Sequence, residues 1–348
     1  MKKIKMIYKW IIISITLQTI VLVYLNYFYL PRRGKVTATI IEQTNMVSSD
    51  WRIQIPDSAG SPCVSYDGRY AAYFYDGKIV VIDAVNENET ASISAEEGEL
   101  TYFRWLPDRN MLIYASCSNV KKHSIVTIST YDVITGDKRS YPDISKLPLY
   151  SRTVGIELSP LTNIVYVKIK TGDGRALIYR FNIMDNCEFI ANKELGVVIR
   201  ETNYSDKLVY QEGNYMIIVR DGSDKSEYAL EFEGKMALLG IDSEDKVYAA
   251  ELNNDGKVIF VHYGEINTAD VSSWEKLYLN KAVDPERLII SKGGAIYMNI
   301  PEESRVLAME VDREYKYTGE LIEITDNYIV TRKKGQLTLS LINTDIGL

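Results

Sequence analysis

Two hydrophobic patterns divide the chain. From Trp10 to Leu30 the sequence contains 21 consecutive uncharged residues, whereas beyond residue 60 the apolar residues occur in short runs rich in Val, Ile, Tyr and Thr. A helix of that length spans about 30 Å, which is the thickness of a hydrocarbon core. The first pattern predicts one N-terminal transmembrane helix. The second pattern almost lacks the helical period and predicts β-strands.

The apolar run has the features of an uncleaved signal anchor. It ends in Tyr29, Leu30 and Pro31 instead of the small residues of a cleavage site. Four lysines precede the run and three basic residues follow it, which favours a cytoplasmic N-terminus under the positive-inside rule. We therefore expect a single-pass protein of the cell membrane, with residues 1–9 in the cytoplasm, residues 10–30 in the membrane and the C-terminal domain outside.

Turn signals separate the short apolar runs of the second pattern. Each pairs Gly with Asp, Asn or a second Gly, and Gly supplies the positive φ that a tight hairpin needs. The pairs are Asp67-Gly68, Asp76-Gly77, Gly136-Asp137, Asp173-Gly174, Gly213-Asn214, Asp221-Gly222, Asp255-Gly256 and Gly293-Gly294. Many short strands joined by tight turns predict an all-β domain.

The predicted strands repeat at a regular interval. Equivalent turn positions occur at Asp67, Asp108, Leu161, Ser205, Glu244, Gly293 and Thr325, with spacings of 41, 53, 44, 39, 49 and 32 residues. A period of about 40 to 45 residues with four strands per unit is typical of propeller blades. We expect an all-β propeller of six or seven four-stranded blades over residues 57–348, preceded by a linker and lead-in strand over 31–56.

The lead-in strand has a predicted role in closing the ring. Residues 51–55 alternate apolar and polar side chains, as a strand does. An open propeller would expose two sheet edges. We therefore expect this strand to pair with a strand from the C-terminal end of the chain.

Two segments resemble a known repeat. Residues 65–73 read SYDGRYAAY, and the segment that begins at Leu106 reads LPDRNMLIY. Both are similar to the repeat of TolB-like, WD40-like (PD40-type) β-propellers, which also builds the propeller of the dipeptidyl-peptidase IV family. The resemblance covers most of residues 60–344 and is best in the first three repeats. It implies a propeller fold, in which we expect the small Ala71 and Ala72 to let neighbouring sheets pack closely.

Charge and residue usage narrow the function. The chain has 40 basic and 47 acidic residues, and its first 35 residues hold seven of the basic and none of the acidic ones. The remainder therefore has a formal charge of −14. Such a domain repels phosphate backbones, so we expect no nucleic-acid binding. The bias toward Lys, Ile, Asn and Tyr is typical of bacteria with AT-rich genomes.

Residues for catalysis are scarce. Only His123 and His262 are available as a histidine base, and there is no G-x-S-x-G, H-E-x-x-H, C-x-x-C or P-loop motif. We expect no catalytic, cofactor-binding or metal-binding residues, and so no enzyme. The alternative is a lactonase-like or hydrolase-like propeller enzyme with a metal or carboxylate site in the central channel. Converging Asp, Glu and Asn side chains there would favour the enzyme, and a mixed or apolar wall would favour a scaffold.

The three cysteines leave two alternatives. Cys63, Cys117 and Cys187 are far apart in the sequence. They form either one disulfide with one free thiol, or three reduced thiols. We favour three buried, reduced thiols, because free cysteine is among the most buried residue types.

Two segments interrupt the repeat. Residues 138–153 form a predicted loop with basic and aromatic residues, which is either a long connection between blades or a contact surface. Its candidate partner-binding residues are Lys138, Arg139, Tyr141, Lys146, Tyr150 and Arg152. In the second segment, residues 267–287, we expect Trp274 to pack between blades.

These observations together predict a function in binding. We expect a membrane-anchored, extracytoplasmic β-propeller that acts as a non-catalytic binding or scaffold module in a bacterial cell envelope. Its expected partners are the membrane, through residues 10–30, and another envelope protein. The sequence points to no particular small-molecule ligand and no cofactor.

Overall fold

The chain contains two compact units. The computed structural model describes residues 2–24, 46–182, 184 and 186–342. The units comprise Met1–Thr44 and Asn45–Leu348. The first unit contains helix α1 (Lys2–Tyr24), which begins eight residues before the predicted span. None of the helices in the described ranges is both long and apolar enough to cross a membrane. Residues 25–30 of the predicted span lie outside the described residues.

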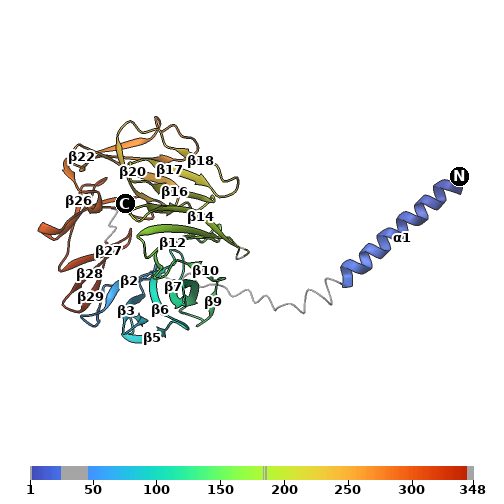
Figure 1. Ribbon diagram of the computed structural model, residues 1–348, viewed down its shortest axis with the longest axis horizontal. Helices are drawn as coiled ribbons and strands as arrows, with labels where there is room; N and C mark the ends of the chain where they lie inside the picture. Colours follow the sequence, from blue (N-terminus) through green and yellow to red (C-terminus); the bar gives the residue numbers. More distant parts are fainter. Residues whose placement is uncertain (1, 25–45, 183, 185, 343–348) are drawn as a thin grey trace. The chain divides into compact units, whose positions relative to one another are not determined.

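The second unit is a β-propeller with seven blades (Figure 1). Each blade is an antiparallel sheet; in six of the blades all strands come from one continuous segment of the chain, and the seventh adds an N-terminal strand to three C-terminal strands. Blade 1 contains β2 (Gly60–Val64), β3 (Tyr70–Tyr75), β4 (Lys78–Asp83) and β5 (Asn88–Ile93). Blade 2 contains β6 (Glu99–Trp105), β7 (Met111–Val120) and β8 (His123–Asp132), with β9 (Lys138–Ser140) and β10 (Ile144–Leu147) at its outer edge. Blade 3 contains β11 (Arg152–Ser159), β12 (Ile164–Lys170), β13 (Arg175–Phe181) and β14 (Cys187–Glu194).

The remaining blades complete the ring. Blade 4 contains β15 (Val198–Glu201), β16 (Lys207–Gln211), β17 (Ile217–Asp221) and β18 (Glu227–Ala229). Blade 5 contains β19 (Lys235–Ile241), β20 (Lys246–Leu252), β21 (Val258–Glu265) and β22 (Glu275–Val283). Blade 6 contains β23 (Leu288–Ile290), β24 (Ile296–Ile300), β25 (Arg305–Ala308) and β26 (Arg313–Lys316). Blade 7 contains β27 (Glu320–Ile324), β28 (Tyr328–Lys333), β29 (Gln336–Leu341) and β1 (Trp51–Gln54).

The lead-in strand closes the ring as predicted. Strand β1 pairs antiparallel with β29 and places Trp51 opposite Leu339. The indole Nε1 of Trp51 donates to the carbonyl of Gly68 in blade 1 at 2.7 Å. Blade 7 is therefore built from both ends of the propeller sequence, and the blade number is seven. The three-residue segments Pro285–Arg287 and Pro301–Glu303 form short 3-10 helices between strands.

The predicted turn positions all lie at one end of the ring. Each of the seven falls between the first and second strands of a blade. In blade 1, Asp67 Oδ1 accepts hydrogen bonds from Ser65 Oγ (2.6 Å) and the Arg69 amide (3.0 Å), and Gly68 has a φ of 79°. We call this end the turn face. The opposite end, which carries the turns between second and third strands and the connections between blades, is the connection face.

Packing between blades follows the alternation of side chains along each strand. Ala71 and Ala72 are fully buried and face opposite sides of blade 1. Ala71 packs in a cluster with Tyr328 of blade 7, and Ala72 packs in a cluster with Phe103 of blade 2. Trp274 is buried in the cluster between blades 4 and 5. The predicted packing roles of these residues are confirmed.

The cysteines are free thiols. Cys117 is buried, Cys63 is half-buried and Cys187 is exposed. The expectation of three buried thiols is wrong for Cys187, because this residue begins β14, the outermost strand of blade 3.

Candidate functional site

Blade 2 differs from the other blades in the length of its central hairpin. Strands β7 and β8 have 10 residues each. The longest second or third strand of any other blade, β21, has 8 residues, and the second and third strands of the adjacent blade 1 have 6 each. At about 3.3 Å per residue, the hairpin extends ~13 Å further than that of blade 1.

The outer edge of blade 2 consists of two short strands. Strand β9 pairs with β8 over residues 129–131, and β10 pairs with the opposite end of β8, at Ser124 and Val126. The prediction of a loop over 138–153 is therefore wrong for residues 138–140, 144–147 and 152–153, which lie in strands. The segment forms strands because the long β8 exposes a free edge, which two short pieces cover.

Three of the predicted partner-binding residues have contacts within the propeller. Lys138 forms an ion pair with Glu96, and this hydrogen bond raises the pKa of Lys138 and lowers that of Glu96. The guanidinium of Arg139 lies 5.7 Å from the ring centre of Tyr141, which is itself 5.3 Å from the ring of Phe181 in blade 3. These side chains stabilise blade 2 against its neighbours.

The other three predicted residues are exposed on the connection face: Lys146, Tyr150 and Arg152. Tyr150 lies in the connection between blades 2 and 3 and has 74% of its surface exposed. No other aromatic residue described in these two blades is exposed to this extent. Its backbone amide donates to Asn119 Oδ1 at 3.3 Å, and the next amide, of Ser151, donates to Ser124 Oγ at 3.2 Å. These bonds hold the connection between blades 2 and 3 against the tip of the long hairpin.

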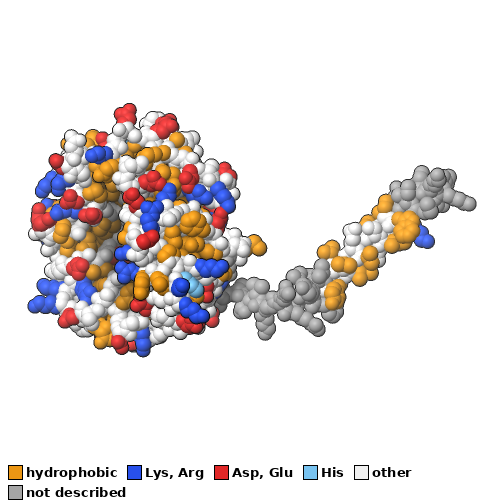
Figure 2. Space-filling view, in the orientation of Figure 1, with side chains coloured by type: hydrophobic (Ala, Val, Ile, Leu, Met, Phe, Trp, Pro, Cys, Tyr) orange, Lys and Arg blue, Asp and Glu red, His pale blue; other side chains and the backbone are white. Residues whose placement is uncertain are grey.

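Three further lysines adjoin these exposed residues. Lys121 and Lys122 form the turn between β7 and β8, and Lys170 lies directly opposite Arg152 where β12 pairs with β11. We call the five cations the basic patch: Lys121, Lys122, Lys146, Arg152 and Lys170. Figure 2 shows basic side chains gathered beside a histidine on this part of the surface.

The basic patch carries unneutralised charge. No carboxylate of the described residues forms an ion pair within 4.0 Å with any of its five members. Sequence reasoning found two of the five, Lys146 and Arg152. The adjacent Lys121-Lys122 pair was a visible signal for a charged hairpin tip. No sequence signal places Lys170 beside Arg152, because that contact depends on strand register.

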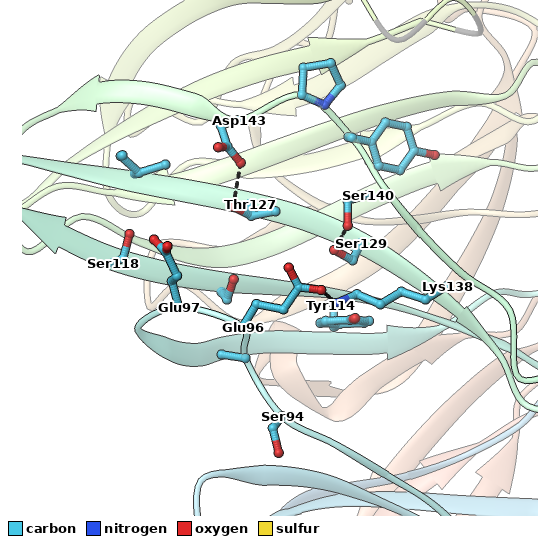
Figure 3. Close-up of a pocket in the computed structure, with 15 residues that line it drawn as sticks. Ser94, Glu96, Glu97, Tyr114, Ser118, Thr127, Ser129, Lys138, Ser140 and Asp143 are labelled. Atoms are coloured by element: carbon cyan, nitrogen blue, oxygen red, sulfur yellow. Dashed lines mark hydrogen bonds and ion pairs between the residues drawn. The ribbon is translucent and has the colours of Figure 1, made fainter.

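A polar groove lies on the face of the long hairpin that is directed toward blade 1 (Figure 3). Its volume is about 550 Å³. Near the turn face, Leu112 and Tyr114 of β7 pack against blade 1. Further along the same face, β7 presents Ser116 and Ser118 to the groove, because the shorter strands of blade 1 do not reach that far. The hydroxyl groups that line the groove belong to Ser94, Ser116, Ser118, Thr127, Ser129 and Ser140.

Several polar side chains of the groove bond to one another, and the groove is acidic. Figure 3 shows Glu96 beside Lys138, above Tyr114, and Ser129 directed toward Ser140. The hydroxyls of Ser129 and Ser140 lie 2.8 Å apart, and the Tyr114 hydroxyl is buried with no hydrogen-bond partner among the described residues. Glu96, Glu97 and Asp143 outnumber the single cation of the groove, Lys138. The long hairpin thus has an acidic side and a basic tip.

The central channel has a wall of mixed charge. The first strands of adjacent blades contact one another around it. Across them, Glu157 of blade 3 accepts from Arg104 of blade 2 (3.2 Å) and from Arg200 of blade 4 (3.4 Å). On β27, burial raises the pKa of Glu323 to about 7. The described part of the wall therefore contains both cations and carboxylates.

One of the two histidines, His262, packs inside the propeller. His262 is buried, with its Nε2 2.8 Å from Glu251 Oε2 and its ring edge-on to Phe232 at 5.6 Å between ring centres. Its surroundings are those of a packed side chain. Among the described residues, no group of three or more His, Cys, Asp and Glu side chains is arranged to hold a metal ion.

The fold defines the chain as a WD40-like, seven-bladed β-propeller. Neither a protein-family model nor a curated protein matches the sequence. A solved structure that is similar is the β-propeller domain of Cps50 (Swd1) from Myceliophteria thermophila, with a TM-score of 0.53 and 12% sequence identity. The similarity covers 83% of this chain and 98% of that domain and concerns the fold. The more specific resemblance to TolB-like and dipeptidyl-peptidase IV propellers stays a prediction.

Proposed function

We propose that the propeller is a non-catalytic binding module that recruits an acidic partner protein through the basic patch of blade 2. The observation that carries this proposal is the gathering of five cations from three separate segments, without an ion-paired carboxylate among the described residues. It occurs on a domain with a formal charge of −14. Like charges held together on a surface repel one another, and an acidic partner removes that repulsion.

Electrostatics also supports one orientation of the partner. An acidic protein is repelled by most of this domain and attracted by the basic patch, so the field directs its approach to blade 2. Tyr150, exposed beside the patch, provides an aromatic anchor of the kind that interfaces favour. The groove on the adjacent side of the hairpin is acidic, so it repels an acidic partner that would bind there instead of at the basic patch.

The same proposal includes a location. Residues 10–30 would anchor the domain in the cell membrane with a cytoplasmic N-terminus, so that the partner is another protein of a bacterial envelope. The support is the run of 21 uncharged residues and the basic excess before it. Protease added to intact cells should remove the propeller and leave a membrane-bound N-terminal fragment. A propeller that stays protected, or that separates from membranes in salt washes, would contradict the location.

The test of the partner site uses the full chain and two matched variants. In the first, Lys121, Lys122, Lys146 and Arg152 are replaced with Ser; in the control, Lys333→Ser and Lys334→Ser change the corresponding hairpin turn of blade 7. Immobilised wild-type and control proteins should retain the same acidic protein from envelope extracts, and the patch variant should retain at least ten-fold less. Equal retention by all three proteins would refute the basic patch as the site.

A further inference from the structure

A cavity with a volume of about 350 Å³ lies between blades 4 and 5. Residues 231–234, which connect the two blades, form one wall, and residues 270–272, from the loop between β21 and β22, form another. The Glu231 amide donates to the carbonyl of Ala269 at 2.9 Å and so fastens the loop to the connection. The loop belongs to the second segment that interrupts the repeat, residues 267–287, so the irregular part of blade 5 builds this cavity.

Carboxylates outnumber cations in the lining of the cavity. Its four carboxylates belong to Glu231, Glu233, Glu251 and Asp270, and its single lysine is Lys276. Four carboxylates against one lysine give a formal charge of −3 with neutral histidine. None of the four forms an ion pair within 4.0 Å with a lysine or arginine of the described residues. The adjacent Lys235 is directed to blade 4, where its Nζ lies 5.5 Å from the ring centre of Tyr215.

Two of these carboxylates are held in place by groups that leave their charge uncancelled. Asp270 accepts hydrogen bonds from the amide (2.8 Å) and the hydroxyl (3.0 Å) of Ser272. These bonds lower the pKa of Asp270. Glu251 is half-buried, and one of its oxygens lies 2.8 Å from His262 Nε2. The acidic character of the cavity is therefore fixed by the structure on both sides, at the loop and at β20.

The cavity also contains a buried acceptor without a donor. His262 lines the cavity and is 5% exposed. Because the Glu251 carboxylate can only accept, His262 Nε2 is the donor of their hydrogen bond, and Nδ1 of the neutral ring is an acceptor. This Nδ1 is buried with no hydrogen-bond partner among the described residues. Buried polar atoms of folded proteins are almost always paired, so an acceptor left open in an acidic cavity points to a ligand that donates.

We propose that this cavity binds a small organic cation that carries N–H groups, of the primary ammonium or guanidinium class. The four carboxylates supply the negative charge, and His262 Nδ1 accepts a hydrogen bond from the ligand. Charge-assisted hydrogen bonds of this kind are stronger than neutral ones. The site lies on blades 4 and 5, so it does not depend on the function proposed for the basic patch of blade 2.

The probes for the test are 1,4-diaminobutane and methylguanidine, both of which are charged at about pH 7.5. The full chain is titrated with each probe by calorimetry at constant ionic strength. Tetramethylammonium, a cation without N–H groups, and Ca²⁺ serve as controls. We expect saturable binding of at least one N–H probe at one site per chain, with tetramethylammonium and Ca²⁺ at least ten-fold weaker.

Three variants locate the binding. Glu251→Gln removes one charge of the cavity and keeps an acceptor for His262, and it should weaken binding at least five-fold. His262→Phe keeps a buried ring and removes the open acceptor, and it should weaken binding several-fold. Glu244→Gln is the matched control, because it removes the same charge from the turn between β19 and β20 of the same blade. It should bind as the wild-type protein does.

Each outcome decides the proposal. The Tm of every variant shows whether it is folded, and Glu251→Gln decides the site if His262→Phe does not fold. Failure of both N–H probes to saturate the wild-type protein overturns the proposal. Binding of tetramethylammonium or Ca²⁺ as tight as that of the N–H probes also overturns it, as does equal binding by wild-type and folded Glu251→Gln protein or equal weakening by Glu244→Gln.

Discussion

Blades 2 and 7 have the same kind of charged turn, but different residues surround it. Each has a pair of lysines at the turn between its second and third strands, Lys121-Lys122 in blade 2 and Lys333-Lys334 in blade 7. In each turn one lysine has a positive φ, 54° at Lys121 and 47° at Lys334. The neighbours of these turns differ.

In blade 7 the neighbours of the turn serve ring closure. Strand β29 pairs with β1, and Arg332 donates to the carbonyls of Ala59 (2.8 Å) and Asp57 (2.7 Å) in the connection to blade 1. In blade 2 the longer hairpin extends past blade 1, and its lysines adjoin three further cations. A charged turn thus becomes a candidate binding site when the fold places further cations beside it. Blade 7 should therefore control stability, and blade 2 should control binding.

The largest expected effect is on ring closure. Trp51→Ala removes a buried indole and its hydrogen bond to Gly68. Large-to-small replacement of a buried aromatic residue costs about 3 to 5 kcal/mol. Urea unfolding of the variant should show a loss of this size. A loss under about 1 kcal/mol would mean that β1 does not hold the ring closed.

A second effect in blade 7 depends on pH. The pKa of Glu323 is raised from its ordinary value of 4.5 to about 7. Between these two pH values the folded protein holds a proton that the unfolded chain has released, so the free energy of unfolding falls as pH rises through this window. Glu323 is half-buried, so solvent screening reduces the effect to about 1 to 3 kcal/mol.

The variant Glu323→Gln isolates this contribution. It removes the titration and keeps a side chain of similar size that still forms hydrogen bonds. Urea unfolding at pH 5 and pH 8 should therefore show a smaller difference for the variant than for the wild-type protein. An unchanged difference would assign the pH dependence to other groups.

Salt should weaken recognition by blade 2 while it leaves the ring intact. Raising ionic strength from about 0.05 M to about 0.5 M shortens the screening length to a few Å. We expect retention of the acidic partner by wild-type protein to fall about ten-fold, with little change in Tm. Retention that is unaffected by salt would indicate an apolar interface instead of the basic patch.

The smallest expected effect is on the stability of the patch variant. Exposed substitutions usually change stability by less than about 0.5 kcal/mol. The quadruple Ser variant of the basic patch and the Lys333→Ser, Lys334→Ser control should both unfold within this range of wild type, as measured by urea titration. A larger loss in the patch variant would show that its cations have a structural role, in contrast to the proposed division between the blades.

Much of the fold was predictable because its signals are local. The Asp67-Gly68 turn and the alternation of residues 51–55 depend on neighbouring residues, so their roles were visible in the sequence. The number of blades was not, since the last two repeats keep only their spacing. The split edge strand of blade 2 was missed because it depends on the length of its partner, β8.

The candidate sites were less accessible to prediction. The sequence indicated the region 138–153, and two of its cations are in the basic patch. Lys170 joins them only through the pairing of β11 with β12. Such contacts depend on register and ring closure, for which a single sequence has no local signal.

The most direct test of blade 2 as the binding site is a titration of the full chain with a labelled polyglutamate peptide, followed by fluorescence anisotropy at low salt. Wild-type protein and the Lys333→Ser, Lys334→Ser control should bind with equal affinity. The quadruple Ser variant of Lys121, Lys122, Lys146 and Arg152 should bind at least ten-fold more weakly. Equal affinities for all three proteins, or an equal loss in the blade 7 control, would contradict the account.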